Sequence, residues 1–259
     1  MSTTSVPGTT STILEQEFEQ LNALVAGYDD SPFDRRMRHW MLRSLSPWIR
    51  GASGLELGCL YGEFTKLLVS HFQRLTVVDA AQQFLDITAK TVGQPVGCNL
   101  SYKHSLFETL ACDEQFDCIF LMHVLEHLID PVAVLEKAKS FLAPAGRMFL
   151  VVPNATAISR QLAARMGALK HQEDFSAADI RGGHRRIYRM DTLQGDARSA
   201  GLTIEHSGGI FFKPLANFQF DALAGGPYIS EQYMEACYEL GKDHPTLCAS
   251  IFLVCQVAS

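Results

Sequence analysis

Three histidines and one glutamate have the types and the spacing that chemistry at neutral pH requires. His123, Glu126 and His127 stand at positions i, i+3 and i+4, and His184 lies further along the chain. Because an unperturbed imidazole changes its protonation near neutral pH, each histidine is a candidate for removing a proton from a substrate. On a helical turn the first three side chains would share a face, so together with His184 they are also candidate ligands of one divalent ion, Zn, Fe or Mn rather than Mg. A third interpretation is that Glu126 and His127 only cap and pack a turn.

A glycine turn followed by an acid forms the second candidate site. Residues 53–65 read SGLELGCLYGEFT, which is typical of a short buried strand, a turn and the start of a helix. Gly58 and Gly62 carry no Cβ, so the backbone can approach a ligand there. Asp79 ends the next apolar run, at the distance along the chain from which an acid reaches ribose hydroxyls. Glu56 would be costly to bury unpaired, so we expect it to accept N–H groups of the turn or to approach a cation of the ligand.

The spacing of the glycines shows which class of nucleotide-binding site a sequence can form. A dinucleotide turn requires G-x-G-x-x-G and a phosphate loop requires G-x-x-x-x-G-K-[ST], because each must aim several N–H groups at phosphate oxygens. The chain contains neither pattern and reads E-x-G-x-x-x-G instead. A nicotinamide-linked or other nucleotide enzyme on the same fold is therefore an alternative that the motif disfavours.

Four blocks of sequence resemble class I S-adenosylmethionine-dependent methyltransferases. The pattern at 56–62 resembles the family's first motif, E/D-x-G-x-G-x-G, with Leu60 where the middle glycine usually stands. Residues 116–131, FDCIFLMHVLEHLIDP, resemble the F-D-x-I strand and the V-L-E-H-x-x-D-P segment that follow in many members. Residues 142–154 resemble the L-x-P-G-G turn and fifth strand, and residues 182–188, GGHRRIY, resemble the family's G-H-x-R-x-Y/F segment.

The resemblance implies an activity and a set of site residues. It implies an enzyme that binds S-adenosylmethionine and moves its methyl group to an oxygen or nitrogen atom of a small-molecule acceptor by in-line displacement, leaving S-adenosylhomocysteine. The catalytic candidates are His123, His127 and His184. The resemblance assigns the cofactor to Glu56, Gly58, Cys59, Gly62, Asp79, Ser105, Leu106 and Met122. A scaffold that has lost catalysis is the alternative, for which Leu60 in the glycine turn is the hint.

The histidine cluster resembles one branch of the family in particular. The run His123 to His127 with a distant His184 is similar to the E-x-x-E-H plus His metal-ligand set of small-RNA 2′-O-methyltransferases and of ubiquinone-biosynthesis O-methyltransferases. His123 replaces the first glutamate of that set. A divalent metal is consequently left open here, and so is the choice between a metal and a single histidine base.

Hydrophobic periodicity predicts the elements that must position these groups. Strands alternate with helices, which indicates a Rossmann-like α/β fold with a mostly parallel seven-stranded sheet covered by helices on both faces. The predicted strands are about 53–57, 75–79, 98–103, 116–122, 147–152, 202–206 and 250–257, and the predicted helices are near 13–27, 33–48, 62–72, 81–92, 131–142, 191–200 and 230–240.

One domain over residues 13–259 follows from the length and the pattern, with residues 1–12 as a disordered tail. Residues 13–50 are expected to form a helical cap. Two insertions, 154–190 and 215–247, are expected to hang over the ligand crevice and select the acceptor. The first insertion is rich in arginine, which predicts attraction of an anionic acceptor or merely a solvated face. Aromatic residues in both caps would suit a planar acceptor.

The composition of the chain limits the kinds of partner and environment that we expect for it. With 259 residues, 47% of them hydrophobic, the chain can bury one sizeable core. A net charge of −6 argues against a broad nucleic-acid surface, and no apolar run reaches the length of a membrane span. Seven cysteines without a C-x-x-C pair indicate a reducing cytoplasm. Monomer and homodimer both remain open.

Overall fold

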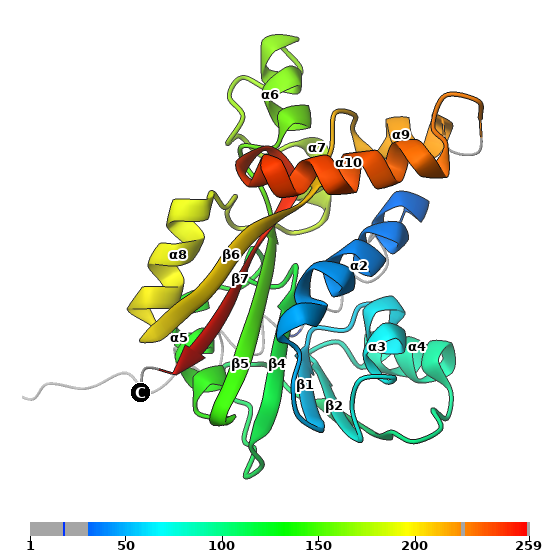
Figure 1. Cartoon of the computed structure of the whole chain (residues 1–259). Coiled ribbons are helices and arrows are strands. Elements are labelled where there is room, and N and C mark those ends of the chain that lie inside the picture. The colour runs from blue at the N-terminus through cyan, green and yellow to red at the C-terminus, as the bar shows by residue number, and fades with distance from the viewer. Residues whose placement is uncertain (1–17, 19–30, 224–225, 258–259) are drawn as a thin grey trace, which may run out of the picture.

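A seven-stranded sheet forms the centre of the molecule (Figure 1). The structure is a computed structural model, and it describes residue 18 and residues 31–223 and 226–257. The strands are β1 (Ser53–Leu57), β2 (Arg74–Asp79), β3 (Asn99–His104), β4 (Phe116–Met122), β5 (Leu142–Pro153), β6 (Leu202–Phe212) and β7 (Cys248–Val257).

The strand order is β3-β2-β1-β4-β5-β7-β6. Neighbours among β1 to β5 are parallel, while β7 runs antiparallel to both β5 and β6. Every residue of β1 is buried, as expected for a central parallel strand that is covered on both faces. The predicted α/β fold is confirmed. The order reverses beside β1, and a crevice for ligands opens at such a switch point.

One face of the sheet packs against helices from both ends of the chain. These helices are α2 (Pro32–Leu45), α3 (Glu63–Leu68), α4 (Gln82–Val92) and α10 (Glu231–Asp243). In α2, Met37, Met41 and Leu45 recur every four residues and are all buried, because that spacing keeps them on one side of a helix. Ser31 caps this helix by accepting the N–H of Asp34 at 3.1 Å. The 3₁₀ turn η1 (Ser46–Trp48) then leads into β1.

The other face packs against α5 (Pro131–Lys139) and α8 (Met190–Ser199). Proline at the first position of α5 and Asp130 before it start the helix, since the carboxylate accepts the N–H of Ala133 at 3.0 Å. Because side chains alternate along a strand, Leu55 and Leu57 of β1 join this second core, while Glu56 points to the face that carries α3.

The two predicted insertions carry short helices at one end of the sheet, at the top of Figure 1. They hold α6 (Ile158–Arg165), α7 (Ala177–Arg181), α9 (Asn217–Leu223), α10 and the 3₁₀ turn η2 (Pro245–Leu247). The predicted helix at 13–27 and the predicted tail lie outside the described residues, except for Phe18. No helix in the described part of the chain is long and apolar enough to cross a membrane.

Candidate active site

A cavity of about 720 Å³ lies where the parallel strands end. Its lining includes residues at or just after the ends of β1, β2, β4 and β5, and side chains of α2, α6, α7 and α9 cover it. The predicted residues that line it are Glu56, Gly58, Cys59, Asp79, Leu106, Met122, His123, His127 and His184. The fold therefore brings most of the predicted site to one place.

Asp79 ties the glycine turn to the end of β2. One carboxylate oxygen accepts the N–H of Cys59 at 2.9 Å, and the other accepts the N–H of Ala81 at 2.9 Å. The N–H of Gly58 reaches back to the carbonyl of Val78 at 2.8 Å. The carboxylate thus fixes the shape of both turns that border the cavity.

Leu60 adopts a conformation that glycine adopts more easily. Its φ is +48°, and the two glycines that flank it in the turn, Gly58 and Gly62, also have positive φ values, of +84° and +80°. A left-handed conformation costs a residue with a Cβ roughly 1–2 kcal/mol. The departure from the glycine pattern at this position therefore places strain in the turn, and the leucine side chain becomes part of the cavity wall.

Glu56 is buried in the wall of the cavity beneath the turn. One of its oxygens accepts the hydroxyl of Thr65 at 2.6 Å, and the other, Oε1, makes no hydrogen bond to any described residue. Burial raises the pKa of Glu56 to about 8, although the Thr65 hydrogen bond opposes this. No N–H of the turn reaches this carboxylate among the hydrogen bonds of the described residues, so the predicted bonds to the turn are absent there, and the approach to a ligand cation stays a prediction.

Two residues assigned to the cofactor by resemblance do not line the cavity. Gly62 is the N-cap residue just before α3, and a Cβ there would lie 2.8 Å from the side chain of Thr88, so the glycine allows α3 and α4 to approach closely. Ser105 donates its hydroxyl to the carbonyl of Leu106 at 2.8 Å, and only Leu106 faces the cavity. The structure thus places Leu106, and not Ser105, at the cavity, and the contact of Leu106 with the cofactor stays a prediction.

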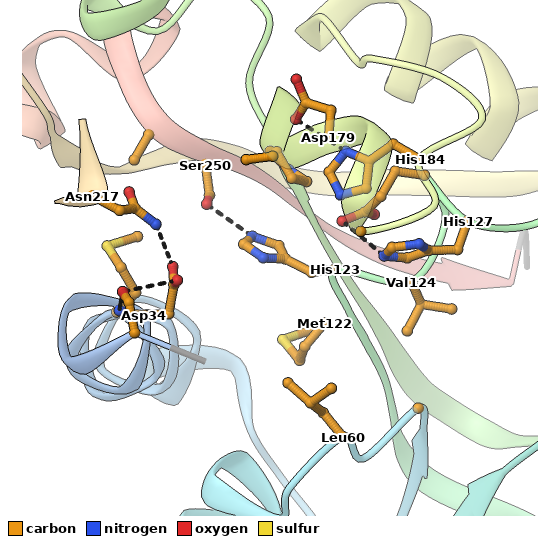
Figure 2. A pocket seen from close by; sticks show the side chains of 18 of the residues that line it. Asp34, Leu60, Met122, His123, Val124, His127, Asp179, His184, Asn217 and Ser250 are labelled. Carbon is orange, nitrogen blue, oxygen red and sulfur yellow. Dashed lines mark hydrogen bonds and ion pairs between the residues drawn. The ribbon is translucent and has the colours of Figure 1, made fainter. Parts of the chain in front are cut away.

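His123 is the first residue after β4 and stands in the middle of the cavity (Figure 2). Its φ of +55° is incompatible with a helix, so the prediction that His123, Glu126 and His127 share a helical turn was wrong. The ring instead turns to Ser250, whose Oγ lies 2.9 Å from Nε2. Burial lowers the pKa of His123 well below its ordinary value, and the charges of Arg38 and His184 lower it further.

Glu126, His127 and His184 form a separate cluster beside it (Figure 2). Their ligand atoms all lie within 4.8 Å of one another. Nδ1 of His184 lies 3.2 Å from Oδ1 of Asp179. Both oxygens of Glu126 are buried and make no hydrogen bond within the described residues. The structure therefore groups three of the four predicted metal-ligand candidates and leaves out His123.

The groups of this cluster differ in protonation. Burial raises the pKa of Glu126 to about 7, and burial lowers that of His127 to about 3. Burial also acts to lower the pKa of His184, but the hydrogen bond to Asp179 and the charge of Glu126 raise it above its ordinary value. At neutral pH the imidazole of His127 is therefore neutral, whereas that of His184 holds a proton more readily than an ordinary histidine, and both lie next to the carboxyl group of Glu126.

The arginines of the first insertion bind the protein itself. Arg160 pairs with Asp179 at 3.0 Å, and Arg189 pairs with Glu173 at 2.9 Å. Arg186 donates to backbone carbonyls of the segment 125–129. These guanidinium groups are thus already paired within the protein, and the attraction of an anionic acceptor by this insertion stays a prediction.

Several cavity residues were not predicted as site residues. They are Ser31, Asp34, Met37, Arg38, Met41, Phe107, Lys213, Asn217 and Ser250, among others. Ser250 lies 127 residues after its partner His123 in the sequence, and no local sequence pattern predicts that the two are in contact. Lys213 directly follows β6, and this position at the end of a strand is the sequence feature that could have indicated a site residue.

Sequence comparison shows which known proteins the chain is similar to. A family model described as "Methyltransferase domain" matches residues 30–207. The chain is 30% identical over 173 residues to the ubiquinone biosynthesis O-methyltransferase of Xylella fastidiosa strain 9a5c, which covers 65% of this chain and 68% of the relative. The corresponding enzyme of Coxiella burnetii strain RSA 331 is 28% identical over 67% of this chain and 72% of its own.

Solved structures share the fold. N-methyltransferase NodS from Bradyrhizobium japonicum WM9, in complex with S-adenosylhomocysteine, has a TM-score of 0.55 and 19% identity, covering 97% of this chain and all of that chain. An S-adenosylmethionine-dependent methyltransferase from Clostridium acetobutylicum has a TM-score of 0.55 and 10% identity, covering 96% and 99%. The match of the family model, the relatives and the crevice beside β1 agree, and the chain belongs to the class I S-adenosylmethionine-dependent methyltransferases.

Proposed function

We propose that the protein methylates an oxygen atom, or alternatively a nitrogen atom, of a small molecule and uses His123 as the base. The observation that carries this proposal is the position of His123: a buried imidazole in the cavity, next to Met122 at the end of β4 and oriented by Ser250. Oxygen is preferred because the curated relatives are named O-methyltransferases. Residues 154–190 and 215–247 would form the acceptor side.

The cavity fits S-adenosylmethionine. The orphaned Oε1 of Glu56 is suited to the ammonium of the methionine portion, because a buried carboxylate gains most from a cation. Asp79 retains unused lone pairs that suit vicinal ribose hydroxyls. A Cβ at Gly58 would lie 2.6 Å from Val124, so the turn and the segment after β4 approach as closely as glycine permits. Leu106 would cover the adenine, and Met122 would flank the sulfonium.

The bound donor supplies an activated methyl group, so the protein mainly aligns the reactants and removes a proton. In the displacement the new bond to the acceptor atom forms as the carbon–sulfur bond breaks, and the electron pair of the broken bond stays on sulfur. His123 would receive the acceptor's proton. Its depressed pKa keeps the ring neutral at neutral pH. In the tautomer that serves as a base, Nε2–H donates to the hydroxyl oxygen of Ser250, and the lone pair of Nδ1 is available for the acceptor's proton.

The cluster beside His123 also fits a divalent ion. The residues that would hold it are Glu126, His127 and His184, and the orphaned carboxyl group of Glu126 supports this fit. Asp179 behind His184 is the kind of outer partner that metal-binding histidines use. An ion there would lower the pKa of a bound hydroxyl.

We expect Mn²⁺ or Zn²⁺ to bind this cluster. Calorimetric titration should find one strong site per chain in the natural protein, and Glu126→Gln should weaken it by more than about 10-fold, the cost of losing even an outer-shell partner. Glu136→Gln, an exposed change on α5, removes the same charge and should leave the site intact. Equal affinity in the Glu126 variant would show that the cluster is not an ion site.

Binding of S-adenosylmethionine is expected to release up to one proton near pH 7. Because the pKa of Glu56 is about 8, its carboxyl group is mostly protonated in the free protein, and an approaching ammonium lowers that pKa. Affinity should therefore rise as the pH increases from 6 to 8. Calorimetry in two buffers of different ionisation enthalpy measures the released proton, and Glu56→Gln should abolish the release. Unchanged proton release in that variant would assign the effect to another group.

A further inference from the structure

Lys213 is a cation that lines the cavity without a carboxylate beside it. Its Nζ donates to Oδ1 of Asn217 at 2.6 Å and lies 5.6 Å from the centre of the Phe33 ring. No carboxylate in the described parts of the chain lies within 4.0 Å of this nitrogen. An ammonium group carries three donors, and the structure uses one of them. The remaining two are available to a ligand in the cavity.

Asp34, the acid whose charge acts most on Lys213, already accepts hydrogen bonds from other donors. Its Oδ1 accepts Nδ2 of Asn217 at 2.7 Å, and its Oδ2 accepts the hydroxyl of Ser31 at 3.0 Å. Asn217 therefore stands between the carboxylate and the ammonium. Burial lowers the pKa of Lys213; Asp34 and Asp179 oppose this from a distance, and Arg160 adds to it. Burying a cation with so little direct compensation costs free energy, and the binding of an anion beside it would lower that cost.

The position of Lys213 relates it to the proposed base. In the antiparallel pairing of β6 and β7, Ile210 lies opposite Ser250, and Lys213 is three residues further along the chain, directly after the end of β6. Ser250 holds His123, and the charge of Lys213 is among those that lower the pKa of His123. Figure 2 shows His123 between the Asp34–Asn217 pair on one side and His127 and His184 on the other. One acceptor molecule can thus face His123 and Lys213 together.

The cavity presents more apolar than polar surface. Phe33, Met37, Met41, Ala163 and Leu169 line the same cavity. Such a surface suits a hydrocarbon or aromatic body and offers few hydrogen bonds to a sugar. An acceptor with one charged end and an apolar body matches both the wall and the ammonium.

We propose that Lys213 binds a carboxylate of the acceptor, so that the substrate is an aromatic or similarly apolar acid whose nucleophilic atom faces His123. This inference rests on the proposed methyl transfer and names its substrate class. A structural role for Lys213 is the competing explanation, in which the side chain only connects the end of β6 to α9 and α2 through Asn217. That role predicts a loss of stability without a change in ligand preference.

Matched acids and amides separate the two explanations. The probes are benzoate, 4-hydroxybenzoate and 3,4-dihydroxybenzoate, each paired with its primary amide, and calorimetry measures their binding to the full chain saturated with S-adenosylhomocysteine. At least one acid should bind about 10- to 100-fold more tightly than its amide, the range expected for a hydrogen bond to a charged group. Lys213→Met should bring the two affinities within about 2-fold, and Lys213→Arg should keep the preference. Lys213→Gln is measured alongside, in case the methionine variant does not fold.

The control variant is Lys90→Met, which removes the same charge from an exposed position on α4 and should preserve the preference. The inference is overturned if no acid binds better than its amide, or if the preference survives in the folded Lys213→Met or Lys213→Gln protein. Failure of the methyl transfer itself is a different result. A protein that does not bind S-adenosylhomocysteine contradicts the proposed function, whereas the acid-to-amide ratio can still be measured on the free protein.

Discussion

Asp79→Ala is expected to weaken the binding of S-adenosylmethionine by about 100-fold, which corresponds to roughly 2.7 kcal/mol. Two losses add up in this variant. The N–H groups of Cys59 and Ala81 lose the acceptors that shape both turns at the cavity, and the ribose hydroxyls lose their proposed partner. Calorimetric titration of the purified variant with the cofactor measures the change.

Two further variants make this result specific. Asp79→Asn keeps one oxygen acceptor and the shape of the side chain, so its loss should be smaller than that of the alanine variant. Asp113→Ala removes a carboxylate from an exposed loop and should bind the cofactor as the natural protein does. Unchanged affinity in a folded Asp79→Ala protein would remove the basis for the proposed cofactor site.

The sheet could be predicted because its strands are locally distinctive. Residues 53–57, 75–79 and 116–122 are apolar runs that end in a turn or an acid, and the structure places strands at these positions. The short helices α6, α7 and α9 were missed because each has eight residues or fewer and buries little apolar surface. Among them, α6 has no buried residue at all. Periodicity cannot mark a helix that has no buried stripe.

The cofactor half of the site was predictable for the same reason. Glu56, Gly58 and Asp79 belong to one strand-turn-helix unit and the next strand, so their spacing along the chain carries the geometry. The acceptor half depends on contacts between distant segments. Ser250 meets His123 across 127 residues, and Asn217 meets Asp34 across 183. The partners of the arginines in the first insertion could not be predicted for the same reason, because the acids and carbonyls that bind them become neighbours only on folding.

The left-handed backbone at His123 explains why its side chain lies apart from the cluster of Glu126, His127 and His184 within the cavity. A φ of +55° turns the chain sharply after β4 and aims the imidazole away from Glu126 and His127, toward β7. Residues with such strain persist when their surroundings hold them in place, and they gather at functional sites. Here the N–H of His123 binds the carbonyl of Val151 at 2.8 Å and the ring meets Ser250. Both contacts orient the proposed base.

His123→Ala is expected to lower kcat by about 100- to 10,000-fold, the usual contribution of a positioned base, while the affinity for S-adenosylmethionine stays within about 2-fold. Ser250→Ala should lose less, because the imidazole remains, and His39→Ala on the exposed face of α2 should lose nothing. Since burial depresses the pKa of His123, the natural protein should show no loss of the base from pH 8 down to pH 6. Transfer of labelled methyl to an accepted substrate measures all of these. If His123→Ala kept kcat within 2-fold while Glu126→Gln abolished it, the ion cluster, not this imidazole, would activate the acceptor.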